Sequence, residues 1–100
     1  MISRFVSAAQ SEYFDAINYY DDKRSDLGLA FSREIERTIN FLVNYPNSGA
    51  LIAPGIRRCL VTRFPYVIIY KIEGDALTII SVSHSKRYPN HWKSRLDTGE

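Results

Sequence analysis

The sequence has few of the residues that would place it in a specialised structural class. Its 100 residues include one cysteine, Cys59, so no internal disulfide can form, which fits a reducing compartment such as the cytoplasm. No apolar run approaches the roughly 20 residues of a membrane span. The first residues lack the basic start and apolar stretch of a signal peptide. We therefore expect a single domain over residues 1–100, in the cytoplasm and without a membrane partner.

Motifs for cofactors are absent as well. No glycine-rich phosphate loop occurs, so we expect neither a nucleotide nor another organic cofactor. The two histidines, His84 and His91, are not spaced as i and i+4, and no carboxylate or thiol accompanies them in the sequence. A metal site is therefore not expected.

Charge is unevenly distributed along the chain. Residues 1–50 contain five Lys/Arg and seven Asp/Glu, whereas residues 51–100 contain eight and four. The first half thus carries a net charge of −2 and the second a net charge of +4. The second half is the part of the chain in which an acidic partner or a polyanion would bind, although an asymmetry of this size is also common by chance.

Hydrophobic periodicity predicts a first strand followed by two helices. The strand is expected within residues 2–6. From about residue 8 to residue 23, and again from 27 to 42, apolar residues recur at the three- and four-residue spacing of a helix. Because the break between the two patterns is short, the helices should form an antiparallel hairpin.

The period changes after a loop that contains Pro54 and Gly55. Three strands are predicted there, in "IRRCLVT", "RFPYVIIYKI" and "ALTIISVSH", with a tight connection at "EGD". The order β-α-α-β-β-β predicts an α+β fold in which a helical hairpin packs on a small, mainly antiparallel sheet. A short C-terminal helix beginning at Pro89 is also compatible with the sequence.

This pattern resembles the RelE/ParE superfamily of bacterial toxins from type II toxin–antitoxin modules. The stretch "YYDDKRSDLGLAFSREIERTINFLVNYPNSG" is similar to the family's tyrosine-rich first helix, Leu-Gly connection, second helix and Pro-x-x-Gly exit. The stretch "IRRCLVTRFPYVIIYKIEGDALTIISVSHSKRYP" is similar to its meander, with an Arg-Phe-Pro-Tyr entry and a His-x-x-Arg after the last strand. Together these stretches cover most of the chain.

The resemblance implies a growth-inhibiting toxin, associated with plasmid stabilization and neutralised by a cognate antitoxin. Two target classes remain open, because ParE-like members inhibit DNA gyrase, whereas RelE-like members cleave mRNA on the translating ribosome. A third alternative is a toxin-like chain that has lost activity and serves only to bind an antitoxin. Because the set of nuclease residues is incomplete, we favour the ParE-like alternative.

A RelE-like nuclease would need a proton-transfer pair and cations near the scissile phosphate. The candidate catalytic residues for that case are Arg58, Arg63, His84 and Arg87. Arg87 matches the arginine that follows the family's last strand. The lysines of the meander and the C-terminal tyrosine that nucleases of this type carry have no clear counterpart, and arginine is a poor proton-transfer group.

A ParE-like toxin needs a surface that binds a protein. The candidate contact surfaces are the helical hairpin and the basic C-terminal segment, and the antitoxin is expected in the groove between hairpin and sheet. Arg57 and Arg58 should point to opposite faces of their strand, and Trp92 is expected to pack on the sheet more readily than to stack a base. The candidate partner-binding residues are Arg57, Arg58, Lys86, Arg87, Tyr88 and Trp92.

Overall fold

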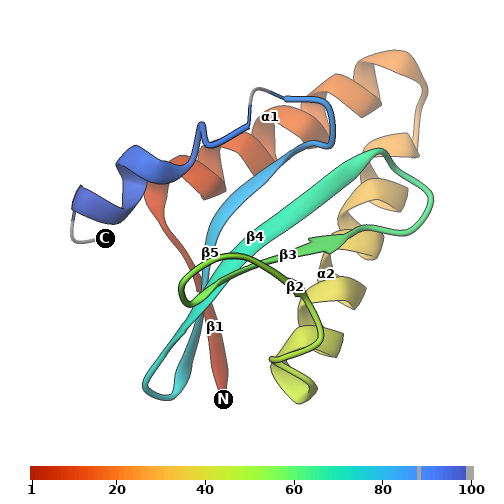
Figure 1. Cartoon of the computed structure of the whole chain (residues 1–100). Coiled ribbons are helices and arrows are strands. Elements are labelled where there is room, and N and C mark those ends of the chain that lie inside the picture. Colours follow the sequence, from red (N-terminus) through yellow and green to blue (C-terminus); the bar gives the residue numbers. More distant parts are fainter. Residues whose placement is uncertain (88, 99–100) are drawn as a thin grey trace.

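A computed structural model describes residues 1–87 and 89–98 (Figure 1). These residues form two helices, five strands and a short 3-10 helix, η1, and the predicted α+β fold is confirmed. The elements are β1 (Ile2–Phe5), α1 (Ser7–Lys23), α2 (Leu27–Asn44), β2 (Ala50–Ala53), β3 (Ile56–Leu60), β4 (Tyr66–Glu73), β5 (Ala76–His84) and η1 (Lys93–Thr98). Among the described residues, no helix is long and apolar enough to cross a membrane.

Two elements differ from the sequence-based expectation. The sequence pattern predicts no strand before the loop that contains Pro54 and Gly55, whereas β2 (Ala50–Ala53) lies directly before these residues. It forms as an edge strand because a tight turn returns the chain onto β3, with Ala53 opposite Ile56. The C-terminal helix begins at Lys93, four residues later than Pro89, and is a 3-10 helix.

The sheet has the strand order β1-β5-β4-β3-β2. β1 pairs with β5 in parallel, while the other neighbours are antiparallel, so the sheet is mainly antiparallel as predicted. β1 reaches only the first half of β5, from Ala76 to Ile79. Among the described residues, the second half of β5 therefore has no strand on that side.

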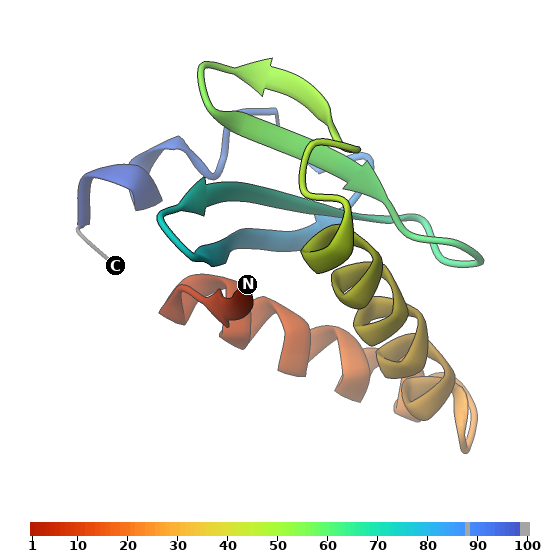
Figure 2. The same ribbon diagram turned by 90° about the horizontal axis from the view of Figure 1, so that it is seen from below.

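The sheet has a helix-covered face and an opposite face. Figure 2 shows both helices on one side of the sheet. The helix-covered face holds the larger core, in which Phe31, Leu42 and Tyr70 are fully buried. A smaller core on the opposite face joins residues of β3, β4 and β5 to Trp92 and Leu96 of the C-terminal segment, which we define as residues 85–87 and 89–98. This segment thus covers the opposite face, which no helix of the hairpin reaches.

The two helices approach closely at Gly28. A Cβ atom there would lie 2.3 Å from the carboxylate of Asp21 and 2.7 Å from the carbonyl oxygen of Ile17. The Asp21 carboxylate accepts a hydrogen bond of 2.9 Å from the Gly28 N–H, which satisfies a free donor in the first turn of α2. Glycine is therefore required at this position, where α2 begins and packs closely against α1.

The loop between α2 and β2 is anchored by the sheet. The buried hydroxyl of Tyr70 donates to the carbonyl of Pro46 at 2.7 Å and accepts from the Gly49 N–H at 3.0 Å. The Arg57 guanidinium donates to the carbonyls of Asn47 and Gly49, at 3.0 and 2.7 Å. These bonds pair backbone groups of the loop before β2, and they fix the entry of this strand.

Candidate functional site

The carboxylate of Glu12 in α1 connects the C-terminal segment to the rest of the protein. The Glu12 side chain is 12% exposed. Its oxygens accept hydrogen bonds from the guanidinium groups of Arg87, at 2.5 Å, and Arg95, at 2.6 Å. The Nε2 atom of His91 lies 3.7 Å from the same carboxylate. One helical residue thus holds three side chains that follow the last strand.

Glu12 also satisfies the open edge of β5. Its carboxylate accepts from the backbone N–H of Val82 at 3.1 Å and from the hydroxyl of Ser81 at 3.0 Å. The Arg95 guanidinium donates to the carbonyl of Ile80 at 2.8 Å. An unpaired strand edge is open to water and to other chains, so these side chains take the place of a neighbouring strand.

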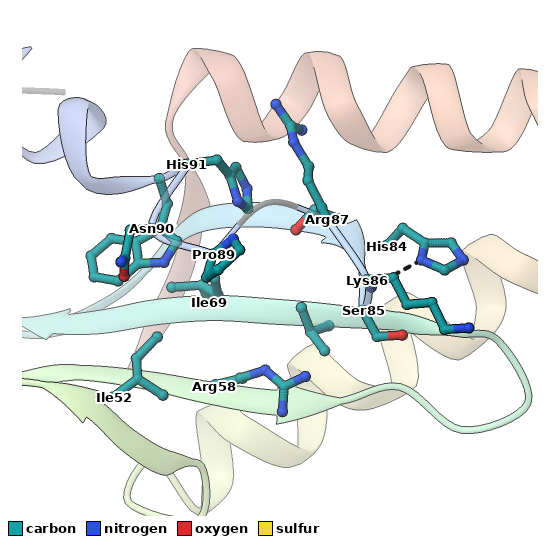
Figure 3. Close-up of a pocket in the computed structure, with 13 residues that line it drawn as sticks. Ile52, Arg58, Ile69, His84, Ser85, Lys86, Arg87, Pro89, Asn90 and His91 are labelled. Atoms are coloured by element: carbon teal, nitrogen blue, oxygen red, sulfur yellow. Dashed lines mark hydrogen bonds between the residues drawn. The ribbon is translucent and has the colours of Figure 1, made fainter.

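A cavity of about 440 Å³ lies between the opposite face of the sheet and the C-terminal segment (Figure 3). Val67 and Ile69 of β4 line it together with Trp92, which gives it an apolar surface. Arg58 of β3 and Lys86 bring positive charge to the same cavity. Its composition matches a site for a ligand that is part apolar and part anionic.

His84 and Arg87, two of the candidate catalytic residues, line the cavity but are engaged elsewhere. The Nδ1 atom of His84 accepts a hydrogen bond of 3.1 Å from the Lys86 N–H, so a neutral His84 carries its proton on Nε2 and has no free lone pair. The Arg87 side chain points towards α1 (Figure 3), where it pairs with Glu12. Burial raises the pKa of Tyr66, whose ring lies 5.7 Å from that of His84, so this phenol stays protonated at neutral pH.

The three candidate arginines of the meander lie in different environments. Arg63 is exposed in the β3–β4 connection, with φ of 75° and its guanidinium 5.9 Å from the ring centre of Phe64. It is not among the described residues that line the cavity. Arg57 holds the loop before β2, as described above, whereas Arg58 lines the cavity. The prediction that the side chains of Arg57 and Arg58 point to opposite faces of their strand is confirmed.

The other candidate contact residues also differ in exposure. Lys86 is exposed. Trp92 is 2% exposed and belongs to the small core, so it packs on the sheet, as expected from the sequence. It also lines one wall of the cavity. Tyr88 lies outside the described residues. Within the described part of the chain, no group of three His, Cys, Asp or Glu side chains is placed to hold a metal ion.

Glu12 is the residue that the sequence did not indicate. It lies on α1 among other polar residues of the helix surface, and its partners Ser81, Arg87 and Arg95 are about 70 to 80 positions away, as the separations of 69, 75 and 83 residues show. Periodicity places Glu12 outside the apolar stripe, but it gives no information on such distant contacts. Glu12 could be identified in advance only with the knowledge that β1 stops short of the second half of β5.

Comparison with known proteins identifies the family. A family model described as the ParE toxin of the type II toxin-antitoxin system, parDE, matches residues 4–89. The chain belongs to the ParE toxin family. The resemblance inferred from the sequence is therefore confirmed, and it lies on the ParE side of the superfamily. Membership implies a cognate antitoxin as a partner.

A solved structure supports the fold. The structure titled "Chromosomal ParDE TA system from P. aeruginosa" matches with a TM-score of 0.73 and 18% sequence identity. The match covers 84% of this chain and 95% of that chain. At this identity the similarity shows a shared fold. Among curated proteins, none matches the sequence at a significant level.

Proposed function

We propose that this ParE-family toxin inhibits bacterial growth by binding DNA gyrase in the cytoplasm. The observation that carries the proposal is the match of the ParE toxin family model over residues 4–89. The ParE-like members that the sequence resembles act on gyrase by binding, which requires a contact surface and no proton relay. We further propose that residues 1–100 act as one toxin domain.

The arrangement of the candidate nuclease residues supports a binding function. Arg58 and His84 line the cavity, the Arg87 side chain is paired with Glu12, and Arg63 lies outside the cavity lining. Cleavage of RNA through its 2′-hydroxyl needs a base, an acid and cations around one phosphate. The described residues do not bring such a set together, because His84 is oriented as a donor and Arg87 is neutralised.

The cognate antitoxin is the second partner in this proposal. It would neutralise the toxin by laying a helix or an extended segment against the hairpin and the sheet. The basic second half of the chain would attract an acidic segment of that antitoxin. The candidate contact residues for gyrase or antitoxin are Arg57, Arg58, Lys86, Arg87, Tyr88 and Trp92. Such a pair would serve plasmid stabilization, since loss of the antitoxin frees the toxin.

The proposal is tested by a gyrase supercoiling assay with purified toxin. We expect supercoiling to be blocked at micromolar toxin and restored when the antitoxin encoded beside it is added. Topoisomerase I relaxation of the same plasmid serves as a control and should be unaffected. Unchanged supercoiling at saturating toxin would exclude gyrase as the target.

The two alternative functions have separate readouts. Toeprinting on translating ribosomes would reveal cleavage if the chain were a RelE-like endoribonuclease, and Arg87→Ala or His84→Ala would then abolish it. Overexpression without growth arrest would indicate an inactive antitoxin-binding module. We expect uncut mRNA and arrested growth.

A further inference from the structure

Arg87 lies at the rim of the cavity, but its side chain is held away from it. The residue lines the cavity together with Arg58 and Lys86. Its guanidinium nevertheless points towards α1 (Figure 3), where it donates to the Oε2 atom of Glu12 at 2.5 Å. The side chains of Arg58 and Lys86 have no ion pair among the described residues. Of these three cations, Arg87 is therefore the one that is withdrawn from the cavity.

The two carboxylate oxygens of Glu12 have different partners. Its Oε1 atom accepts from the Val82 N–H at 3.1 Å, from the Ser81 hydroxyl at 3.0 Å and from the Arg95 guanidinium at 2.6 Å. Its Oε2 atom accepts from Arg87. The first oxygen thus holds the edge of β5 and the C-terminal segment in place, whereas the second holds Arg87.

Of the two arginines that Glu12 binds, Arg87 is the more easily released. The Arg95 side chain is 14% exposed and also donates to the carbonyl of Ile80 at 2.8 Å. The Arg87 side chain is 46% exposed and has Glu12 as its ion-pair partner. An ion pair with one half-exposed partner contributes little to stability. Rotation about the side-chain bonds of Arg87 would therefore suffice to bring its guanidinium into the cavity.

The number of cations that face the cavity decides which anions it can bind. A phosphate group is held by several charge-assisted hydrogen bonds that converge on its oxygens, and arginine supplies such bonds in pairs. Among the described residues, no Asp or Glu lines the cavity. With Arg87 paired to Glu12, the cavity keeps two cations, Arg58 and Lys86, and with Arg87 released it would have three.

We propose that Glu12 determines the ligand specificity of this cavity, because it withdraws Arg87 and so keeps the cavity a poor site for phosphate groups. The anions that it excludes are pyrophosphates and phosphodiesters, whose oxygens need all three cations. The inference goes beyond the proposed function, since it concerns the cavity alone and holds whether or not gyrase is the target.

Glu12→Gln tests the inference without removing the anchor of the C-terminal segment. Because Val82, Ser81 and Arg95 all donate to Oε1, the glutamine carbonyl should take that position. The amide NH₂ group then faces Arg87, and two donors cannot bond to each other. Isothermal titration with inorganic pyrophosphate, in a buffer free of divalent metal ions, should show binding to Glu12→Gln at least about tenfold tighter than to the unmodified chain.

A double-mutant cycle shows whether Arg87 is the cation that Glu12 controls. Arg87→Gln should weaken pyrophosphate binding at least about fivefold more in the Glu12→Gln chain than in the unmodified chain. Arg58→Gln should weaken binding in both chains, because Arg58 lines the cavity in either case. An equal effect of Arg87→Gln in the two chains would overturn the inference.

Asp15→Asn is the matched control for charge. It removes one negative charge from the same helix, and Asp15 is exposed and absent from the described cavity lining. The dissociation constant for pyrophosphate should change by less than about twofold. If Asp15→Asn tightened binding as much as Glu12→Gln, the cause would be net charge, and the inference would be wrong.

Two further measurements do not depend on comparing affinities among variants. The unmodified protein should bind pyrophosphate no more tightly than about millimolar, and micromolar binding would contradict the exclusion of phosphates. In a ¹⁵N-labelled Glu12→Gln sample, pyrophosphate should shift the amide signals of Val67, Ile69 and Lys86. Hydrogen exchange at the Val82 amide should stay slow, which shows that the edge of β5 is retained. Shifts confined to the helices would place the anion elsewhere and overturn the inference.

Discussion

The two faces of the sheet are built by different means. The helix-covered face is held by apolar packing, with Phe31, Leu42 and Tyr70 fully buried beneath α1 and α2. The opposite face has a small core completed by Trp92, and its cover is held in place by the charged contacts of Glu12. The helix-covered face therefore depends on burial of apolar area, whereas the cover of the opposite face combines a small apolar core with the contacts of one carboxylate.

The two faces also differ in how completely their surfaces are filled. Apolar packing contributes in proportion to buried area and leaves no vacant space. The opposite face keeps a cavity lined by Arg58 and Lys86, whose side chains have no ion pair among the described residues. The hairpin thus covers the larger core, while the C-terminal segment covers the smaller core on the other side of the same strands.

The largest expected effect comes from opening the core of the helix-covered face. Phe31 is 0% exposed, and its ring centre lies within 5.2 Å of those of Tyr20, Phe64 and Tyr66. Phe31→Ala should lower the free energy of unfolding by about 3–5 kcal/mol, because it leaves a cavity that aromatic rings cannot refill. Urea unfolding followed by circular dichroism measures this loss.

A surface phenylalanine provides the control for this experiment. Phe14 on α1 is 53% exposed, so Phe14→Ala should change the stability by about 0.5 kcal/mol or less. If Phe31→Ala and Phe14→Ala lowered the free energy of unfolding equally, the result would contradict a stabilising role for the buried aromatic group.

Removing the Glu12 carboxylate should loosen the opposite face selectively. Glu12→Ala leaves Arg95, which is 14% exposed, and the Val82 N–H without their partner. Breaking such a largely buried pair should cost about 2–4 kcal/mol. Hydrogen exchange should speed up at Val82 and in the C-terminal segment, while the amides of Phe31 and Leu42 stay protected.

Asp15→Ala is the matched control for Glu12→Ala. Asp15 is an exposed carboxylate on the same helix and has no ion pair among the described residues. Removing the Asp15 carboxylate should leave hydrogen exchange of the backbone amides unchanged. If Glu12→Ala instead accelerates exchange equally on both faces, the two faces unfold as one unit and the distinction fails.

Removing the Tyr70 hydroxyl tests how the helix-covered face holds the entry of β2. Tyr70→Phe leaves the Gly49 N–H and the Pro46 carbonyl unpaired, which should cost about 1–3 kcal/mol. Tyr45 is 61% exposed, so Tyr45→Phe should cost close to nothing. Thermal unfolding of both variants measures the difference, and equal melting temperatures would show that the loop needs no such anchor.

The smallest expected effect is a pH dependence at the β4–β5 turn. A hydrogen bond from Thr78, with a second from Lys71, lowers the pKa of Glu73 from 4.5 to about 2. A lowered pKa means that the stabilisation is complete above pH 4.5 and is lost as the pH falls towards 2. Since Glu73 is 40% exposed, solvent screening keeps the effect small.

Glu73→Gln isolates this contribution. Its melting temperature should lie slightly below that of the unmodified chain at pH 6, and the gap should close between pH 4.5 and pH 2. A gap that stays constant over this range would rule out titration of Glu73 as its cause.

The candidate site was only partly predictable from the sequence. His84, Arg87, Arg58 and Lys86 were identified because basic residues follow or interrupt the apolar strands, and all four line the cavity. Their separate roles were not visible, since Arg87 is neutralised by a residue 75 positions away. A one-dimensional pattern shows residue types and their spacing, but it does not show which charges meet.

The sequence by itself determined the hairpin, the three longer meander strands and the family. Periodicity suffices there because each element must bury its own apolar stripe, as Phe31, Ile35, Ile39 and Leu42 do along α2. Only the tertiary structure decided that β1 leaves one edge of the second half of β5 without a strand and that Glu12 accepts a hydrogen bond at this edge. The physical reason is that an unpaired strand edge requires polar partners from wherever the fold brings them.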